Sequence, residues 1–255
     1  MNRIKFLGIG AGDITMLLQI IPTSSIYVEL DSLKFVIDPG PGTLINMKIN
    51  KVNPLELNGL VVSHLHPDHC ADANAILSGI TKKPSFLIAE ETCLIPKDAS
   101  YPCISKYHQE LVDNVYPVNG GESIKIGNLN FYVFSSKHYL PTVGFRMMGS
   151  KTIGYPSCGS YYNGQENDYE KCDVIVFNTF VPYNKKTPSD LHTGVDDVIK
   201  LINNLKHKPK LIILQHFSLE MLRANPNTQA EIVQKETGVK TIAASYGFEV
   251  NLDEL

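Results

Sequence analysis

The chain has 255 residues, of which 43% are hydrophobic and 19% are charged, so it can bury a large core without disulfides. Its 23 Lys and Arg stand against 26 Asp and Glu, giving a formal net charge of −3, which argues against a general polyanion-binding surface but not against a small phosphate-bearing substrate. With 18 Gly, 15 Pro and no low-complexity run, collagen-like and disordered classes are excluded. We expect one domain over residues 1–255.

The five cysteines include no C-x-x-C pair, which favours a reducing compartment over a disulfide framework or a zinc finger. The N-terminus has no apolar stretch typical of a signal peptide. No later apolar run approaches the roughly 20 residues that a membrane helix needs. These observations predict a soluble, cytoplasmic protein that has no membrane partner.

The first two thirds of the chain are rich in short apolar or alternating runs bounded by Gly, Pro, Asn or Lys. Strands are predicted at residues 4–8, 25–30, 34–38, 60–63, 85–89, 112–118, 123–126, 129–135, 144–148 and 152–155. The pair Asp31-Ser32 between two of them is typical of a hairpin turn, and an Ala-rich helix is predicted over residues 70–78. The later strands of this part have a mostly antiparallel pattern.

From residue 173 onward, strands alternate with helices. Strands are predicted at residues 174–178 and 211–215, and helices at residues 194–205, 219–223 and 228–236. Two halves that each run from strands to helices, with polar clusters at strand ends, predict an α/β fold. We expect a four-layer αββα sandwich in which two sheets pack together and helices cover both outer faces.

Residues 64–69 read H-L-H-P-D-H and follow an apolar strand directly. Imidazole and carboxylate groups are ligands of divalent metals. Because alternate residues of an extended chain project to one side, His64 and His66 are expected to serve one ion, while Asp68 and His69 turn toward a second. The segment therefore predicts two neighbouring metal sites. A solvated His-rich loop is the alternative, which the ordered flanking elements disfavour.

This motif matches the H-x-H-x-D-H signature of the metallo-β-lactamase-fold superfamily of metal-dependent hydrolases, which the chain resembles over nearly its whole length. Further matches occur in the right order, with D-P-G at residues 38–40 before the motif, and a His after a strand at 138 and another at 216 after it. The resemblance implies two metal sites, one held by His64, His66 and His138, and the other held by Asp68, His69 and His216. Asp38 is expected to orient a ligand histidine.

One departure concerns the residue that bridges the two metals. The superfamily usually presents an Asp in a Y-x-G-D-T segment, and residues 155–159 here read Y-P-S-C-G, so Cys158 occupies that position. A thiolate is a good zinc ligand and a poor one for magnesium, so two Zn²⁺ ions are expected, with Mn²⁺ or Fe²⁺ as alternatives. An ordinary buried thiol with a water bridge is the competing interpretation of Cys158, and a weakened, single-metal protein is another.

The resemblance also implies the chemistry, which is hydrolysis by a metal-bound hydroxide that Asp68 orients. Residues 173–180, 190–194 and 211–218 are similar in order and spacing to the ribonuclease Z branch of phosphodiesterases. In that branch a His that matches His192 is thought to protonate the leaving oxygen, supported by a Glu. Here the Glu position is Asn178, so we expect proton donation by His192 to be less well tuned. A helix-capping role is the alternative for His192.

The acidic balance and the lack of a long basic insertion favour a small phosphodiester or nucleotide substrate over a folded RNA, although an RNA end remains a candidate. Members of the ribonuclease Z branch commonly form dimers, so the resemblance implies a homodimer. A thioesterase or lactonase with the same metals, and a catalytically weakened binding protein, are the competing functions. Tyr161 and Tyr162 are predicted either to line the pocket mouth or to pack, and the glycines of residues 8–12 to form a loop beside the active site.

Overall fold

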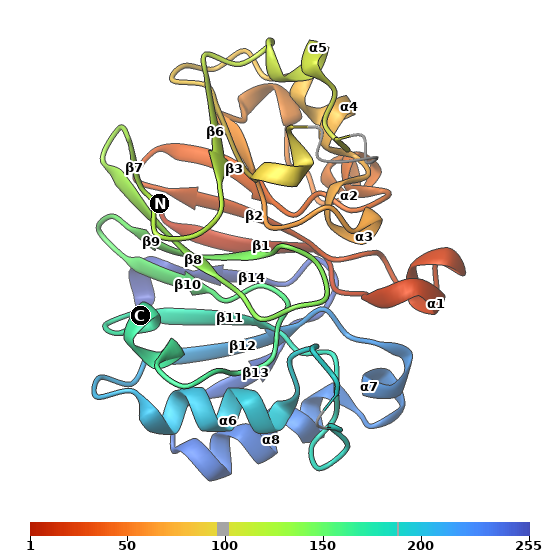
Figure 1. Cartoon of the computed structure of the whole chain (residues 1–255), viewed down its shortest axis with the longest axis vertical. Coiled ribbons are helices and arrows are strands. Elements are labelled where there is room, and N and C mark those ends of the chain that lie inside the picture. The colour runs from red at the N-terminus through yellow and green to blue at the C-terminus, as the bar shows by residue number, and fades with distance from the viewer. Residues whose placement is uncertain (96–101, 188) are drawn as a thin grey trace.

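A computed structural model describes residues 1–95, 102–187 and 189–255. Two seven-stranded sheets face each other across the middle of the molecule (Figure 1). The first has the order β14-β1-β2-β3-β4-β5-β6, with β1 Arg3–Gly8, β2 Ser25–Leu30, β3 Leu33–Ile37, β4 Gly59–Val62, β5 Phe86–Glu90, β6 Asn114–Val118 and β14 Glu249–Asn251. The second has the order β13-β12-β11-β10-β9-β8-β7, with β7 Ser123–Ile126, β8 Leu129–Ser135, β9 Val143–Met148, β10 Thr152–Tyr155, β11 Val174–Asn178, β12 Leu211–Gln215 and β13 Thr241–Ala243.

Each sheet combines parallel and antiparallel pairs. Strands β3 to β6 pair in parallel, as do β10 to β13, whereas β7 to β10 form the antiparallel part expected from the sequence. Parallel strands end at the same edge of a sheet. Residues that directly follow β3, β4, β11 and β12 are therefore gathered at such edges, and this arrangement assembles the site described below.

Helices cover both outer faces. Their bounds are α1 Gly12–Leu17, α2 Thr43–Ile49, α3 Pro67–Cys70, α4 Ala73–Leu77, α5 Lys106–Gln109, α6 Val195–Asn204, α7 Leu219–Arg223 and α8 Pro226–Thr237, with 3₁₀ turns η1 Pro54–Glu56, η2 Glu91–Cys93, η3 Gln165–Tyr169 and η4 Leu252–Glu254. In Figure 1, α2, α4 and α5 lie beside the first sheet, α6 and α8 lie below the second, and α1 projects from one side. The predicted four-layer αββα sandwich is confirmed.

Three apolar clusters hold the four layers together. Between the sheets, the rings of Phe35, Phe86 and Phe131 lie 5.6–5.9 Å apart in tilted or edge contacts, which are favourable geometries for aromatic pairs. A second cluster joins the first sheet to α2 and α4, and includes Met47. A third joins the second sheet to α6 and α8, and includes Val198. The parallel strands are buried on both faces for this reason.

Most predicted strands are confirmed to within two residues, and the hairpin turn is confirmed by positive φ angles at Asp31 (47°) and Ser32 (72°). The predicted helix over residues 70–78 is wrong in extent. Two short helices replace it, and α3 begins inside the metal motif because Pro67 is well suited to the first helical position. Helices α1, α2 and α5 and strands β13 and β14 were not predicted. No helix in the described part of the chain is both long and apolar enough to span a bilayer.

Candidate metal centre

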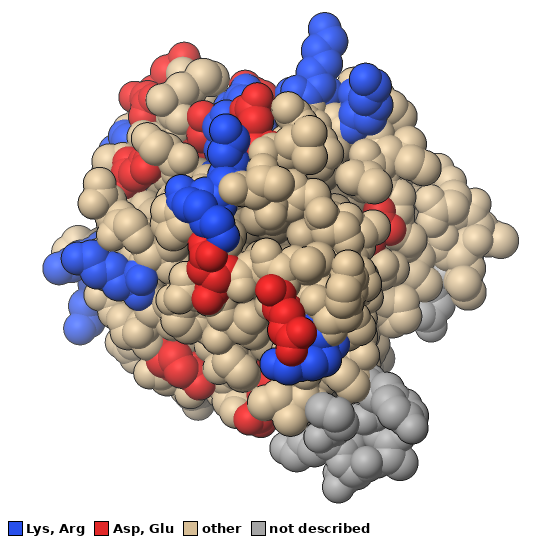
Figure 2. Space-filling view, turned by 90° about the horizontal axis from the view of Figure 1, so that it is seen from above, with Lys and Arg blue, Asp and Glu red and all other residues tan. Residues whose placement is uncertain are grey.

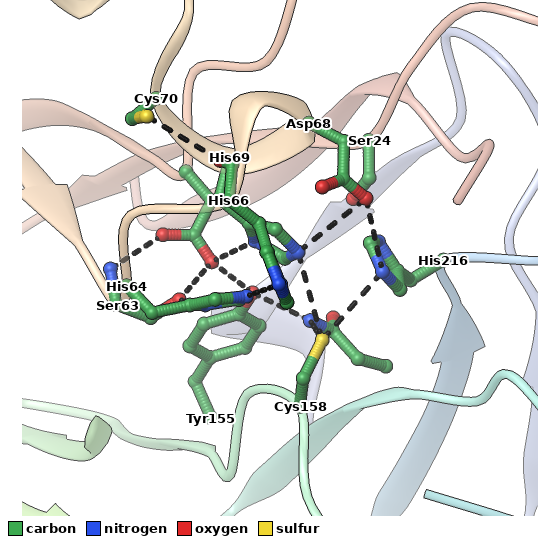
Figure 3. A network of polar contacts seen from close by, with 12 residues as sticks. Ser24, Ser63, His64, His66, Asp68, His69, Cys70, Tyr155, Cys158 and His216 are labelled. Carbon is green, nitrogen blue, oxygen red and sulfur yellow. Dashed lines mark hydrogen bonds and ion pairs between the residues drawn. The ribbon is translucent and has the colours of Figure 1, made fainter. Parts of the chain in front are cut away.

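The seven predicted metal-ligating residues converge on one end of the sandwich. Figure 3 labels all of them except His138. His64 and His66 follow β4 in extended or turning backbone, whereas Asp68 and His69 belong to α3. Three non-glycine residues at the ends of strands adopt left-handed backbone here, namely Asp38 (φ 50°), Ser157 (φ 60°) and His216 (φ 63°). Such strain is concentrated at functional sites because it fixes side-chain direction.

The first group of donors consists of His64, His66 and His138, whose ring nitrogens lie within 4.8 Å of one another. Nδ1 of His138 lies 3.2 Å from the carbonyl oxygen of Leu191, so Nδ1 carries the proton and donates it. The other nitrogen, Nε2, is buried and has no hydrogen-bond partner among the residues that the structure describes. A buried lone pair without a partner is costly, and a metal ion at this position would satisfy it. This group therefore fits a divalent ion.

The second group consists of Asp68, His69 and His216, with Cys158 beside them. Oδ2 of Asp68 lies 3.7 Å from Nε2 of both His69 and His216, and Sγ of Cys158 lies 3.6 Å from the same two nitrogens. Donors on a tetrahedral zinc ion are separated by roughly 3.3 to 3.6 Å, given its bond lengths. Cys158 also groups with His64 and His69, which puts its sulfur between the two groups.

Asp38 orients His69, one of the donors of the second group. Its buried carboxylate accepts hydrogen bonds from the Ser63 N–H and hydroxyl (2.7 Å each), from Nδ1 of His69 (2.9 Å) and from the Tyr155 hydroxyl (2.6 Å). Because Nδ1 of His69 donates to Asp38, Nε2 keeps its lone pair for a metal. The Ser63 hydroxyl lies 2.9 Å from Nδ1 of His64 and fixes that ring in the same way. Asp38 thus orients a proposed ligand histidine, as expected.

Burial and neighbouring charges set the protonation of these donors in the metal-free protein. Burial lowers the pKa of His64 and of His216 well below the ordinary histidine value, so both are neutral and available as ligands. Burial opposes ionisation of Asp68, but the charge of His69 outweighs it and lowers the carboxyl pKa to about 2. His69 responds in the opposite sense, because Asp68 outweighs burial and raises its pKa well above the usual range.

A cavity of about 220 Å³ opens beside both groups and is lined by every proposed ligand except His64, together with Gly12, Pro67, Tyr139, Phe180 and His192. The His192 ring stacks on Phe180 with centroids 4.1 Å apart and an interplanar angle of 15°. The Gly12 N–H donates to Oδ2 of Asp68 at 3.2 Å, so the predicted glycine loop does border the site. Tyr161 and Tyr162 are not among the lining residues and instead bond Glu166 and Asp168.

The carboxylate beside His192 is Asp190, which the sequence analysis missed. Oδ1 of Asp190 lies 3.0 Å from Nδ1 of His192 and accepts the His192 backbone N–H at 2.8 Å. Asn178, which was expected in the supporting position, makes no hydrogen bond to His192 in the described part of the chain. The pattern D-x-H, in which an Asp side chain bonds the backbone two residues on, is the sequence signal that would have found Asp190.

Asn178 contacts the bridging cysteine instead. Its amide donates to Sγ of Cys158 at 3.2 Å and to the Tyr155 hydroxyl at 3.0 Å, and Gln215 fixes its orientation by donating to the amide oxygen. A neutral donor stabilises a thiolate, whereas a carboxylate in this position would repel it. Cys158 and Asn178, the two departures from the ribonuclease Z pattern, are therefore compatible, because the Asn178 amide can stabilise a thiolate at Cys158.

The chain belongs to the beta-lactamase superfamily, because its residues 34–217 match the family model described as the beta-lactamase superfamily domain. The family is hydrolytic, and its fold holds divalent metal ions. The match includes all seven proposed ligands as well as His192. The two donor groups described above could hold such ions in this chain.

Three relatives extend this finding. An uncharacterized protein of Methanocaldococcus jannaschii is 29% identical over 98% of this chain and 95% of its own length. A ribonuclease Z of Methanococcus maripaludis is 28% identical over 56% of this chain and 46% of that enzyme. The cAMP/cGMP-dependent 3′,5′-cAMP/cGMP phosphodiesterase B of Dictyostelium discoideum is 21% identical over 93% of this chain. The chain spans only 22% of the length of the Dictyostelium enzyme.

Solved structures share the fold over the whole chain. The metallo-beta-lactamase fold protein YhfI of Bacillus subtilis superposes with a TM-score of 0.76 at 15% identity, covering 98% of both chains. The short form of human tRNase Z superposes with a TM-score of 0.68 at 14% identity, covering 98% of this chain and 99% of that one.

Proposed function

We propose that this protein is a zinc-dependent phosphodiesterase that acts on a nucleotide or an RNA end. The observation that carries the proposal is the pair of donor groups, His64, His66 and His138 on one side and Asp68, His69, His216 and Cys158 on the other, beside a cavity that also contains His192. Named relatives with phosphodiesterase and ribonuclease Z activities support this choice of reaction over carbonyl hydrolysis.

The residues have separate roles in the proposed reaction. Two divalent ions would supply Lewis acidity and lower the pKa of water near a phosphoryl centre. Asp68, fixed by the Gly12 N–H, would hold one of these ions and would accept a hydrogen bond from the attacking water. His192 in its imidazolium form donates the Nε2 proton to the leaving oxygen, while Asp190 holds the ring by accepting from Nδ1. The thiolate of Cys158 favours zinc over magnesium.

Charge and cavity size support a small substrate. On the face drawn in Figure 2, basic and acidic side chains are interspersed over a largely uncharged surface, whereas a protein that grips a folded RNA needs many phosphate contacts from basic residues. The cavity volume of about 220 Å³ suits one scissile phosphate and its immediate substituents. We therefore favour a nucleotide or a short RNA end over an intact tRNA.

We also propose a homodimer, a cytoplasmic location and a single domain. The exposed apolar side chains of α2, Ile45 (66%) and Ile49 (61%), support self-association, because clustered exposed apolar residues commonly mark an interface. Light scattering measures the mass in solution, and a monomeric mass would overturn the dimer.

A substrate screen tests the proposed reaction. Protein loaded with two zinc equivalents is assayed with bis(p-nitrophenyl) phosphate, a cyclic nucleotide, a thioester and a lactone. The proposal predicts that phosphodiester turnover exceeds the turnover of both carbonyl substrates. A large preference for the thioester or the lactone would move the function to carbonyl hydrolysis, and no turnover of any substrate would favour a binding protein of the same fold.

A further inference from the structure

A second cavity, of about 370 Å³, adjoins the metal cavity between α1 and α7, which lie on the same side of the molecule in Figure 1. Gly12 and Phe180 line both cavities. A side chain at Gly12 would strike Phe180, because a Cβ atom there would lie 2.7 Å from its ring. Glycine at this position therefore allows the Phe180 ring to lie against the backbone at the boundary of the two cavities. A group bound at the metals can extend past this ring into the second cavity.

We call this second cavity the α1–α7 pocket. Both of its walls are connected to residues of the metal centre. The wall formed by α1 begins at Gly12, which donates to Asp68. Helix α7, which forms the other wall, begins three residues after His216, and the hydroxyl of its N-cap residue Ser218 donates to the Phe180 carbonyl at 2.6 Å. The position of the pocket relative to the metal ligands is therefore fixed by the hydrogen bond to Asp68 on one side and by the short stretch of chain after His216 on the other. That is the requirement for a subsite that binds the non-reacting part of a substrate.

The lining of the pocket combines apolar surface with a few polar groups at one end. Ile14, Phe180 and Leu219 supply the apolar surface, and Glu220 and Arg223 supply an acceptor and a donor. Neither charged side chain makes an ion pair or a side-chain hydrogen bond within the described residues, so both are available to a ligand. A simple alkyl or aryl group would leave these two groups unused. A nucleobase has apolar faces for stacking and a rim of hydrogen-bond donors and acceptors.

We propose that the α1–α7 pocket binds the base of a nucleotide whose phosphodiester lies at the metal centre. This inference rests on the proposed phosphodiesterase function and specifies its substrate class. The base stacks on the face of the Phe180 ring that lines the pocket, and Ile14 and Leu219 pack around the base. Arg223 donates hydrogen bonds to acceptors on the edge of the base. The phosphate next to that base then lies beside His192, which stacks on Phe180.

Two chromogenic esters separate the subsite from the chemistry at the metals. The p-nitrophenyl ester of thymidine 5′-monophosphate and methyl p-nitrophenyl phosphate have the same leaving group and differ in the nucleoside. Base stacking on an aromatic side chain corresponds to roughly a tenfold effect or more, so kcat/KM for the nucleoside ester is expected to exceed that for the methyl ester by at least about tenfold. Equal values for the two esters would overturn the subsite and leave the phosphodiesterase function intact.

The Ile14→Asp variant introduces a charge into the pocket at a side chain that is 56% exposed, so the fold should tolerate it. It should lower kcat/KM for the nucleoside ester by about tenfold and leave the methyl ester unchanged. Leu17→Asp is the matched control, because Leu17 is exposed on the same helix and does not line the pocket. An equal effect of the two substitutions, or none from Ile14→Asp, would contradict the proposal.

Calorimetry with thymidine 5′-monophosphate and methyl phosphate gives a readout that needs no turnover. Zinc-loaded wild-type protein should bind the nucleotide at least about tenfold more tightly than methyl phosphate, and Ile14→Asp should remove this difference. If neither ester is hydrolysed but this difference in binding is found, the phosphodiesterase function fails and the base subsite stands. Equal binding of the two ligands by the wild-type protein would overturn the subsite.

Discussion

Nδ1 of His192 lies 3.0 Å from Oδ1 of Asp190, and the same oxygen accepts the His192 backbone N–H at 2.8 Å. The carboxylate therefore fixes both the ring and its tautomer. Replacing Asp190 by Asn should lower kcat about tenfold for a phosphodiester with a poor alkoxide leaving group, and much less for one that releases p-nitrophenolate, because only the former needs a proton donor. Steady-state kinetics with the two substrates measure the difference.

Asp196→Asn is the matched control, because this carboxylate accepts the Asn184 N–H on the neighbouring loop and makes no hydrogen bond or ion pair with His192 in the described part of the chain. An equal loss with both leaving groups in Asp190→Asn would mean that Asp190 supports the fold rather than proton transfer.

Cys158→Ser tests the thiolate at the second metal group. The sulfur lies 3.6 Å from Nε2 of His69 and of His216, and serine is a much weaker zinc ligand than a thiolate. We expect the number of zinc ions retained after dialysis to fall toward one, while the thermal unfolding of the chelated protein changes little. Elemental analysis by mass spectrometry counts the metal.

Cys172→Ser removes a buried thiol that belongs to none of the donor groups, and it should retain the full zinc content. If Cys158→Ser retains as much zinc as Cys172→Ser, then Cys158 is an ordinary buried thiol.

The ligand set was predictable from sequence because the first four donors occupy six consecutive residues, and because His138 and His216 each follow a recognisable strand in the order that the resemblance implies. Asp190 was missed because the resemblance pointed to residue 178, at the end of β11, as the partner of His192. The pairing of Asp190 with His192 is local and needed only the D-x-H spacing.

The missed elements are short or depend on distant partners. Strand β14 has three residues and pairs with β1 at the other end of the chain, so local pattern gives little signal for it. Helix α1 has six residues and exposes Leu17, so it has no amphipathic pattern of useful length. The α1–α7 pocket depends on that helix, and it could be recognised only in the structure.

Asp38→Asn should weaken metal binding and the fold together. Asp38 is buried and accepts four hydrogen bonds, including those from His69 and Tyr155. An amide nitrogen would face donors where an oxygen now accepts, so we expect a 10- to 100-fold loss of zinc affinity, typical of groups that orient metal ligands. The free energy of unfolding should fall by about 1–3 kcal/mol. Chelator competition and urea denaturation measure the two effects.

Tyr155→Phe removes one of the four donors to Asp38 and leaves the His69 contact in place. It should therefore cost less zinc affinity than Asp38→Asn. The reverse order would contradict the assignment of Asp38 as the residue that orients His69.

The chelated protein should lose stability as the pH falls from about 6.5 toward 4. Burial lowers the pKa of His138 to about 4, whereas the unfolded chain takes up this proton near the ordinary value of about 6.5. Between these values the unfolded state binds more protons, so the free energy of unfolding decreases with decreasing pH. Burial lowers the pKa of His64 and His216 as well, which adds in the same sense. The raised pKa of His69 contributes with the opposite sign, because its stabilisation is lost as the pH rises.

Urea midpoints at pH 7 and pH 5 measure this dependence in the presence of a chelator. His138→Gln should reduce the difference between the two midpoints, and the exposed His207→Gln should not. A midpoint that is higher at pH 5 than at pH 7 in the wild-type chain would contradict the buried, neutral histidines.

On our proposal, two donor groups hold two metal ions that act together on a phosphodiester. The most direct test is a titration of chelated protein with zinc, in which the rate of bis(p-nitrophenyl) phosphate hydrolysis is followed against bound equivalents, with His66→Ala as the variant that lacks a donor of the first group. We predict that the rate rises until two equivalents are bound and that His66→Ala stays inactive. A wild-type protein that binds two zinc ions and hydrolyses no diester, or a fully active His66→Ala variant, would contradict the account.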